Sequence, residues 1–436
     1  MYKIFQLLLL VLSLMVCTGS RAQKASLEFG DMKPYSKEFQ GTGWFILHYE
    51  DNNILAYSMP KGGKLALIRF DNNFNVKQKV VSSVPWYLAD LEYYDGKIKG
   101  VFYDRKLTYC CFDGETLKMT EKKELFLPKG WAADKPSSTG TITGSVVRSV
   151  SWSPNHKYVG VGVFVCQVKY AYFKGFQMSH LYLYDSDFNQ IATTVADYQD
   201  NPSDLSFKPD IKVFDTGELI YKVNNMDCFH ILSKDGFKEY VRYDNNMDII
   251  DYKGDSFVYI GDKIKEYDKN TQKVKTLSIQ PDSISFLSNS WFKKTFEGGK
   301  ARYIIPCKIN NKDYGNTWLN EKFEVENVVK PQFKRNRTLP YNNFTDISDN
   351  AERYYIFVYE YPQEPKPNYA IKRWWLEYYN KYGIFEESEV TELESPVVKN
   401  YSLWYTGNRE YLIWQQNITD NGKNPMQRWV RIKIED

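Results

Sequence analysis

Short runs of alternating hydrophobic and polar residues make up most of the chain. Residues 147–152 (VRSVSW) alternate strictly, and residues 158–168, 181–184 and 190–195 are rich in β-branched and aromatic side chains. Turns rich in Pro, Asn and Asp separate these runs. Strict alternation is typical of half-buried strands, and Pro and Asn favour tight turns. The pattern therefore predicts four consecutive antiparallel strands in this stretch.

The same spacing returns along the rest of the chain. Earlier runs lie at residues 42–49, 53–58, 64–70, 75–82, 86–94, 97–103, 107–112 and 118–126. Further units cover residues 205–243, 247–279, 284–329 and 344–390, and three more strands lie at 399–405, 410–415 and 428–434. Asp95-Gly96 and Asp113-Gly114 are strong hairpin signals. A repeat of roughly forty to sixty residues predicts an all-β fold, a single β-propeller of seven or eight four-stranded blades.

Two short motifs in one repeat carry a family resemblance. Residues 152–158 (WSPNHKY) are followed by residues 181–185 (LYLYD). They resemble the "W-S-P-D-G-K-Y … L-Y-L-Y-D" blade of Tol-B type and WD-repeat-like propellers. The resemblance departs at Asn155-His156, where those families have Asp-Gly. It covers roughly a ninth of the chain and implies a fold, because blades of this kind occur in proteins with unrelated functions.

The two ends of the chain are expected to share one sheet. The last segment supplies only three strands, and residues 25–29 (ASLEF) form an isolated strand at the start. A closed propeller removes the exposed edge that otherwise invites aggregation. The sequence therefore predicts that the N-terminal strand closes the C-terminal blade.

One segment leaves two interpretations open. Residues 369–382 (YAIKRWWLEYYNKY) place Trp375, Tyr378, Tyr379 and Tyr382 at helical spacings. The same residues could form two strands with a turn near Tyr379-Asn380. We favour strands, because aromatic residues are enriched in sheets.

The first 22 residues have the features of a signal peptide. Lys3 precedes an apolar run at residues 5–16, and Ser20 and Ala22 fit the positions that a signal peptidase recognises. We therefore expect residues 1–22 to be removed, residues 23–436 to form the propeller domain, and the protein to be exported to the periplasm or cell surface. Cys17 offers a lipoprotein alternative, but Val16 is a poor fit for the small residue that lipid-processing peptidases prefer. No later stretch is long enough for a membrane span.

Composition narrows the class of protein further. Aromatic residues make up 17% and charged residues 25% of the chain, which suits many strands and argues against extensive disorder. The net charge is +3 without a long basic run, so we expect no nucleic-acid partner. The cysteines that remain after Cys17 is removed are widely spaced, and we expect them to be buried in strands as small hydrophobes. Adjacent Cys110 and Cys111 should point to opposite faces of a strand.

The sequence contains no motif for a metal, a nucleotide or a hydrolase. It has no H-E-x-x-H, C-x-x-C, G-x-S-x-G, P-loop or G-x-G-x-x-G pattern. We therefore expect no metal and no cofactor. Among the histidines, His156 is expected to be solvated in a turn, and His180 and His230 are expected to be structural residues beside strands.

Residues 311–318 (NKDYGNTW) resemble the Asp box of sialidases, S-x-D-x-G-x-T-W. Asp313, Gly315, Thr317 and Trp318 match, and Asn311 replaces Ser. The resemblance implies a structural hairpin turn in which Asp caps backbone N–H groups, Gly takes a positive φ, and Trp packs into the blade. Sialidases carry several boxes and an arginine triad, and this chain has one box without a matching arginine motif. The box therefore supports a propeller more than a glycosidase.

Most aromatic clusters, Trp86-Tyr87 among them, are expected to pack between blades. Ligand binding is expected only of rings in loops. Trp131 lies in the irregular loop 128–144, and Tyr170, Tyr172 and Phe173 lie in the hairpin 168–181. Exposed rings there could stack on sugars or anchor a partner protein.

These observations favour a non-catalytic binding or scaffolding propeller of the bacterial cell envelope. Its protein or glycan ligand is expected on the loop-rich face or at the channel mouth. The alternative is a glycan-active hydrolase, sialidase-like or another propeller glycosidase, with two carboxylates as acid and base. Asp90 and Glu92 flank Leu91 on a predicted strand and are the candidate pair, although solvation explains them equally well. An enzymatic role is left open, with a non-enzymatic one favoured.

Overall fold

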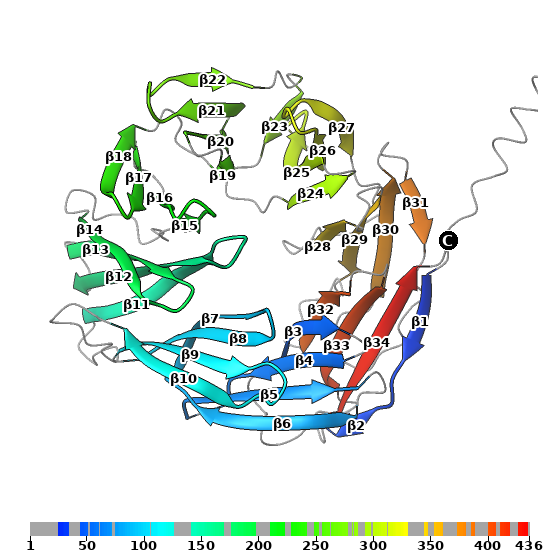
Figure 1. Cartoon of the computed structure of the whole chain (residues 1–436). Helices are drawn as coiled ribbons and strands as arrows, with labels where there is room; N and C mark the ends of the chain where they lie inside the picture. Colours follow the sequence, from blue (N-terminus) through cyan, green and yellow to red (C-terminus); the bar gives the residue numbers. More distant parts are fainter. Residues whose placement is uncertain are drawn as a thin grey trace, which may run out of the picture. The chain divides into compact units, whose positions relative to one another are not determined.

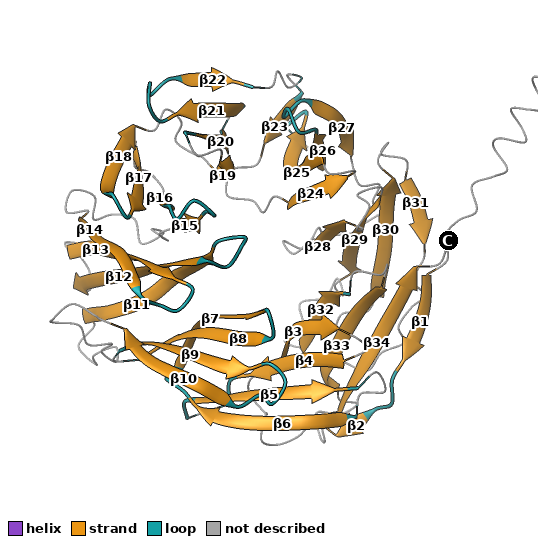
Figure 2. Cartoon of the chain, in the orientation of Figure 1, coloured by secondary structure: helices purple, strands orange, loops and turns teal. Residues whose placement is uncertain are grey.

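The structure is a computed structural model of the chain. It describes residues 25–34, 44–50, 53–60, 62–71, 75–104, 106–125, 141–169, 176–197, 210–222, 228–241, 248–252, 255–261, 263–277, 281, 283–286, 293–297, 300–311, 313–329, 344–347, 353–360, 373–380, 385–388, 400–406, 410–418 and 426–434. The regular structure of these residues is all β-strand (Figure 2). In this described part, no helix has the length and apolar character needed to cross a membrane. The predicted signal peptide, with Cys17, lies outside the described residues.

The chain divides into two compact units. The larger unit comprises Ser36–Lys294 and Tyr303–Glu326, and the smaller comprises Met1–Tyr35, Thr295–Arg302 and Asn327–Asp436. Within the described residues, strands that follow one another in sequence pair in antiparallel sheets (Figure 1). The all-β fold of four-stranded antiparallel sheets is thereby confirmed, and the number of blades stays a prediction.

Consecutive strands build the sheets of the larger unit. The first two sheets contain β3 (Phe45–Glu50), β4 (Asn53–Ser58), β5 (Lys64–Phe70) and β6 (Val76–Ser83), then β7 (Tyr87–Tyr94), β8 (Lys97–Tyr103), β9 (Leu107–Asp113) and β10 (Met119–Leu125). The next two contain β11 (Thr141–Trp152), β12 (Tyr158–Lys169), β13 (Phe176–Asp185) and β14 (Gln190–Asp197), then β15 (Asp210–Val213), β16 (Leu219–Lys222), β17 (Cys228–Ser233) and β18 (Gly236–Val241). Another contains β19 (Asp248–Tyr252), β20 (Ser256–Ile260), β21 (Ile264–Asp268) and β22 (Val274–Thr276).

The later strands follow the same rule. One sheet has the order β23 (Ile284–Phe286), β25 (Lys300–Ile309), β26 (Asp313–Leu319) and β27 (Val325–Val329), with β24 (Lys293–Glu297) paired to β25. The next contains β28 (Phe344–Ile347), β29 (Arg353–Glu360), β30 (Arg373–Asn380) and β31 (Phe385–Ser388). The described part of the segment with two interpretations, residues 373–380, is therefore strand. β30 runs to Asn380, which lies opposite Arg353, so the chain reverses after the predicted turn position.

The chain ends share one sheet, as predicted. β1 (Ala25–Phe29) pairs antiparallel with β34 (Met426–Ile434), from Ala25 opposite Ile434 to Phe29 opposite Val430. β33 (Glu410–Ile418) and β32 (Asn400–Tyr405) complete this sheet, and β2 (Lys33–Pro34) also pairs with β34. The N-terminal strand thus covers the edge that β34 would otherwise expose.

A capped turn between the third and fourth strands recurs from sheet to sheet. An Asp or Asn side chain at the end of the third strand accepts a backbone N–H from three or four residues later, which makes the reversal local. The accepting side chains and their donors are Asp71 with Asn75, Asp113 with Thr116, Asp185 with Asn189, Asp268 with Thr271, and Asn320 with Glu324, at 2.6–3.0 Å. Asp185, the last residue of the "L-Y-L-Y-D" part of the sequence motif, is one of these capping residues.

The hydrophobic core of the larger unit lies between neighbouring sheets. One cluster joins Val101 and Tyr109 of the second sheet to Val161 and Tyr182 of the third, and similar clusters join the first sheet to the second, the third to the fourth and the fourth to the fifth. Packing is so close that a Cβ on Gly160 would approach side chains of the fourth sheet to 2.6 Å. Interior packing of this density tolerates little added volume.

The cysteines behave as predicted where their side chains are described. Cys110, Cys111 and Cys307 are buried free thiols. Cys110 belongs to the cluster between the first and second sheets, and Cys111 to the cluster between the second and third. The two neighbours therefore face opposite sides of β9. The side chains of Cys166 and Cys228 lie outside the described part.

Candidate functional site

Two carboxylates lie on the edge strand of the second sheet. In the sheet order β10-β9-β8-β7, β7 is the terminal strand, and it lies beside β3 and β11, the first strands of the neighbouring sheets (Figure 1). Asp90 and Glu92 are separated by one residue and so share a face of β7, while Leu91 is buried. The carboxylates of Asp90 and Glu92 thus share one face of a strand that lies beside β3 and β11.

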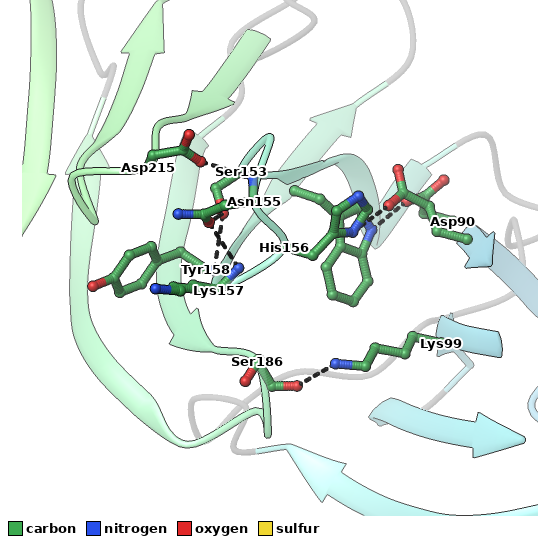
Figure 3. A network of polar contacts seen from close by, with 11 residues as sticks. Asp90, Lys99, Ser153, Asn155, His156, Lys157, Tyr158, Ser186 and Asp215 are labelled. Atoms are coloured by element: carbon green, nitrogen blue, oxygen red, sulfur yellow. Dashed lines mark hydrogen bonds and ion pairs between the residues drawn. The ribbon is translucent and has the colours of Figure 1, made fainter. Parts of the chain in front are cut away.

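A tight turn between β11 and β12 meets this face. The Ser153 hydroxyl donates to Asn155 Oδ1 at 2.8 Å and accepts the Tyr158 N–H at 3.0 Å. The Asn155 N–H donates to Asp215 Oδ1 at 2.8 Å, which ties the turn to the following sheet (Figure 3). These bonds hold His156 at a φ of 54°. Left-handed backbone costs a residue with a Cβ roughly 1–2 kcal/mol, which is why glycine is common there.

The His156 side chain packs onto the strand that carries the carboxylates (Figure 3). Its ring stacks on Tyr94 with centroids 3.8 Å apart, and its Nδ1 lies 3.2 Å from Glu92 Oε2. The imidazole is 20% exposed. The prediction that His156 is merely solvated is therefore wrong, because a strand distant in sequence covers it. His180 and His230 are buried, in agreement with a structural role.

Trp152 ties the other carboxylate to the same turn. Its Nε1 donates to Asp90 Oδ2 at 2.7 Å, across 62 residues of sequence. The Lys99 ammonium lies 5.9 Å from the centre of the Trp152 ring and donates to the Ser186 carbonyl at 2.9 Å. The cluster of Asp90, Glu92 and His156, called the acid–histidine cluster below, is thus fixed by contacts from the third sheet.

The environment shifts all three titratable groups toward their neutral forms. Burial raises the pKa of Asp90, although the hydrogen bond from Trp152 opposes this. Burial, and secondarily the charge of Asp90, raises the pKa of Glu92 to about 7. Burial and the charge of Lys99 lower the pKa of His156. Near neutral pH, Glu92 therefore holds a proton part of the time beside an uncharged imidazole.

The cluster offers proton-transfer groups rather than a metal site. Glu92 Oε2 and His156 Nδ1 are both buried and have no hydrogen bond in the structure. The two atoms lie 3.2 Å apart without forming a hydrogen bond with each other. Among the described residues, no group of three or more His, Cys, Asp or Glu side chains could hold a metal ion.

A second feature is a set of exposed rings at the beginnings of β3 and β7. Phe45 begins β3, Trp86 directly precedes β7, and Tyr87 begins β7; they are 51%, 64% and 55% exposed. Phe45 stacks at a tilt against Tyr57, and Tyr87 stacks on Tyr103. We call Phe45, Trp86 and Tyr87 the aromatic surface. The prediction that Trp86-Tyr87 packs between blades is wrong, because more than half of each side chain is exposed.

The sequence-predicted ligand residues are not among the residues that form these features. Trp131, Tyr170, Tyr172 and Phe173 lie outside the described residues, so their binding role stays a prediction.

The Asp-box residues lie in a strand. Asp313 and Gly315 belong to β26, and Gly315 is opposite Cys307. Positive φ occurs at Asn310 and Asn311, at the start of the box, so Asp313 and Gly315 do not form the turn that the resemblance implied. Thr317 and Trp318 are fully buried.

Comparisons with known proteins give no family. No family model and no curated protein matches the chain. Among solved structures, it is similar to BamB from Moraxella catarrhalis, with 10% identity over 93% of this chain and 99% of that one and a TM-score of 0.43. It is also similar to oligogalacturonate lyase in complex with manganese, with 9% identity over 95% of this chain and 98% of that one and a TM-score of 0.45. A third similar structure is the Cps50 β-propeller domain of Myceliophteria thermophila, with 12% identity over 81% of this chain and 98% of that one and a TM-score of 0.41. Similarity at this level carries no argument about function.

Proposed function

We propose that the protein is a non-catalytic binding propeller of the bacterial cell envelope that binds a partner protein through the aromatic surface. The exposure of Phe45, Trp86 and Tyr87 carries this proposal. Tyr109 and Phe112 of the second sheet, by contrast, are buried. Trp and Tyr are enriched at the energetic centres of protein interfaces, because each supplies a large rigid contact area.

Two sequence features support the rest of the proposal. The signal-peptide pattern of residues 1–22 supports export to the envelope. The Tol-B-like blade motif supports a single propeller spanning residues 23–436, in which variable surfaces are carried by a rigid scaffold.

Removal of two of the three rings of the aromatic surface is expected to weaken partner binding. In Trp86→Ala/Tyr87→Ala, affinity for the partner should fall at least roughly tenfold, as for interface hot spots. The partner is identified by photo-crosslinking in cells from position 86, and its affinity is then measured with purified proteins. Phe237→Ala, which removes an exposed ring of β18, is the matched control and should bind normally. Equal affinity of the double variant and the wild type would contradict the proposal.

The acid–histidine cluster favours a second candidate, a glycan-active hydrolase in which Glu92 is the general acid. A general acid must carry its proton, so activity should fall as pH rises through about 7, the pKa of Glu92. The measurement is a pH profile on a panel of chromogenic glycosides. Glu92→Gln should remove the activity, while Glu124→Gln, on an exposed position of β10, should retain it. Absence of hydrolysis across the panel rules out this candidate.

A further inference from the structure

A cavity of about 350 Å³ lies where the first and second sheets meet. The ends of β3, β5, β7 and β9 and the start of β4 line it, at the end of the sheets opposite the aromatic surface. Small-ligand sites begin at roughly this size. It is therefore large enough for one long side chain of a partner.

Aromatic and apolar groups form part of the cavity lining. The rings of His48 and Tyr93 stack with centroids 4.0 Å apart, and Leu55 is buried beside them. A Cβ on Gly114 would lie 2.5 Å from the Gly96 carbonyl oxygen, so glycine is needed for the two hairpins to approach this closely. The shape of the cavity thus depends on packing that the sheets impose.

Carboxylates dominate the charge of the cavity. Glu50, Asp113 and Glu115 line it, against a single guanidinium from Arg69. Arg69 already donates Nη2 to the Gly114 carbonyl. Hydrogen bonds from Thr116 lower the pKa of Asp113 and keep that carboxylate charged.

The carboxylates of the cavity form few ion pairs with Lys or Arg among the described residues. In the described part of the chain, the ion-pair partner of Glu50 is His48, at 3.2 Å, and the Glu50 side chain is 65% exposed. Glu115 has no ion-pair partner among the described residues. After burial, the charge of Glu50 is the largest cause that raises the pKa of Tyr93; Arg69 opposes it, and Asp113 and Asp95 add to it, so the acidic charges outweigh the guanidinium at this wall. An anionic ligand would be repelled here, and a cation would be attracted.

We propose that this cavity binds a lysine or arginine side chain of a partner protein. The charged head lies among Glu50, Asp113 and Glu115, and the aliphatic stem packs on Tyr93 and Leu55. Long basic side chains suit such a site, because they bury their stems while the charged head stays hydrated or paired. The proposal deepens the proposed function and rests on it for the source of the side chain.

Small probes test the cavity independently of any partner. N-acetyl-arginine amide and N-acetyl-lysine amide each carry one positive charge, and N-acetyl-norleucine amide is the neutral equivalent. Saturation-transfer NMR on the full chain should show millimolar binding of both cations, weakened by salt, and none of norleucine. Glu50→Gln/Glu115→Gln should lower the affinity about tenfold, since two partly exposed charge contacts are lost.

A matched double variant separates the cavity from general electrostatics. Glu121→Gln/Glu124→Gln makes the same change in net charge on β10, away from the cavity, and should bind the probes like the wild type. Binding of norleucine, equal losses in the two double variants, or no binding of either cation would each overturn the proposal. Unfolding midpoints of both variants check that the fold is intact. The probes should still bind to Trp86→Ala/Tyr87→Ala, because these residues do not line the cavity. Probe binding therefore tests the cavity, and partner binding of the same variant separately tests the aromatic surface.

Discussion

Arg431→Met is expected to lower the free energy of unfolding of the sheet that joins the chain ends by about 3–5 kcal/mol. Arg431 Nε lies 2.8 Å from Glu410 Oε1, and the two side chains are only 10% and 13% exposed. Methionine removes the guanidinium and leaves the largely buried Glu410 carboxylate without this partner. Loss of one partner of a buried pair costs more than the pair itself contributes. Urea denaturation of the full chain, followed by tryptophan fluorescence, measures the effect because Trp414 and Trp429 lie in the same sheet.

Two further variants separate the buried pair from surface charge. Arg431→Met/Glu410→Gln should recover most of the lost stability, because no unpaired charge remains buried. Lys433→Met, whose half-exposed ammonium lies 3.8 Å from Glu28, should change the unfolding free energy by less than about 1 kcal/mol. Arg431 also lies opposite Glu28 of β1, so its loss should loosen the closing strand. A cost for Arg431→Met no larger than that of Lys433→Met would show that the buried pair does not stabilise this sheet.

The strand pattern could be predicted from sequence because its determinants are local. Alternation sets which face of a strand is buried, and an Asp at the strand end caps the turn that follows. Asp185, for example, accepts the N–H groups of Asp187 and Asn189, both within four residues. The closure by β1 followed from counting strands, since a lone strand at one end matches an incomplete sheet at the other. These signals need no knowledge of which sheets are neighbours.

The candidate site depends on contacts between sheets, which no local pattern records. Trp152 and Asp90 are joined across 62 residues, and His156 meets Tyr94 and Glu92 over a similar span. One signal was present: His156 occupies the position where similar blades have glycine, and a residue with a Cβ at positive φ is often held there by its side chain. The exposure of Trp86 was equally hidden, because an aromatic residue at a strand end is buried only if a neighbouring hairpin covers it.

Trp318→Ala is expected to lower the free energy of unfolding by about 3–5 kcal/mol. Trp318 is 1% exposed and lies directly opposite Ile304, which is fully buried. Alanine leaves a cavity in close-packed surroundings that cannot collapse to fill it, so both transfer free energy and packing contacts are lost. The measurement is chemical denaturation of the larger unit's core, with Trp318→Phe as the variant that retains most of the ring volume and should lose less.

The contrast with Trp86→Ala makes this prediction specific. Trp86 is 64% exposed, so its replacement should change stability by no more than about 0.5 kcal/mol while removing a ring of the aromatic surface. One tryptophan is thus expected to act on folding and the other on binding. If Trp318→Ala were as mild as Trp86→Ala, the buried ring would not support the sheet, and the structural role implied by the Asp-box resemblance would be lost with it.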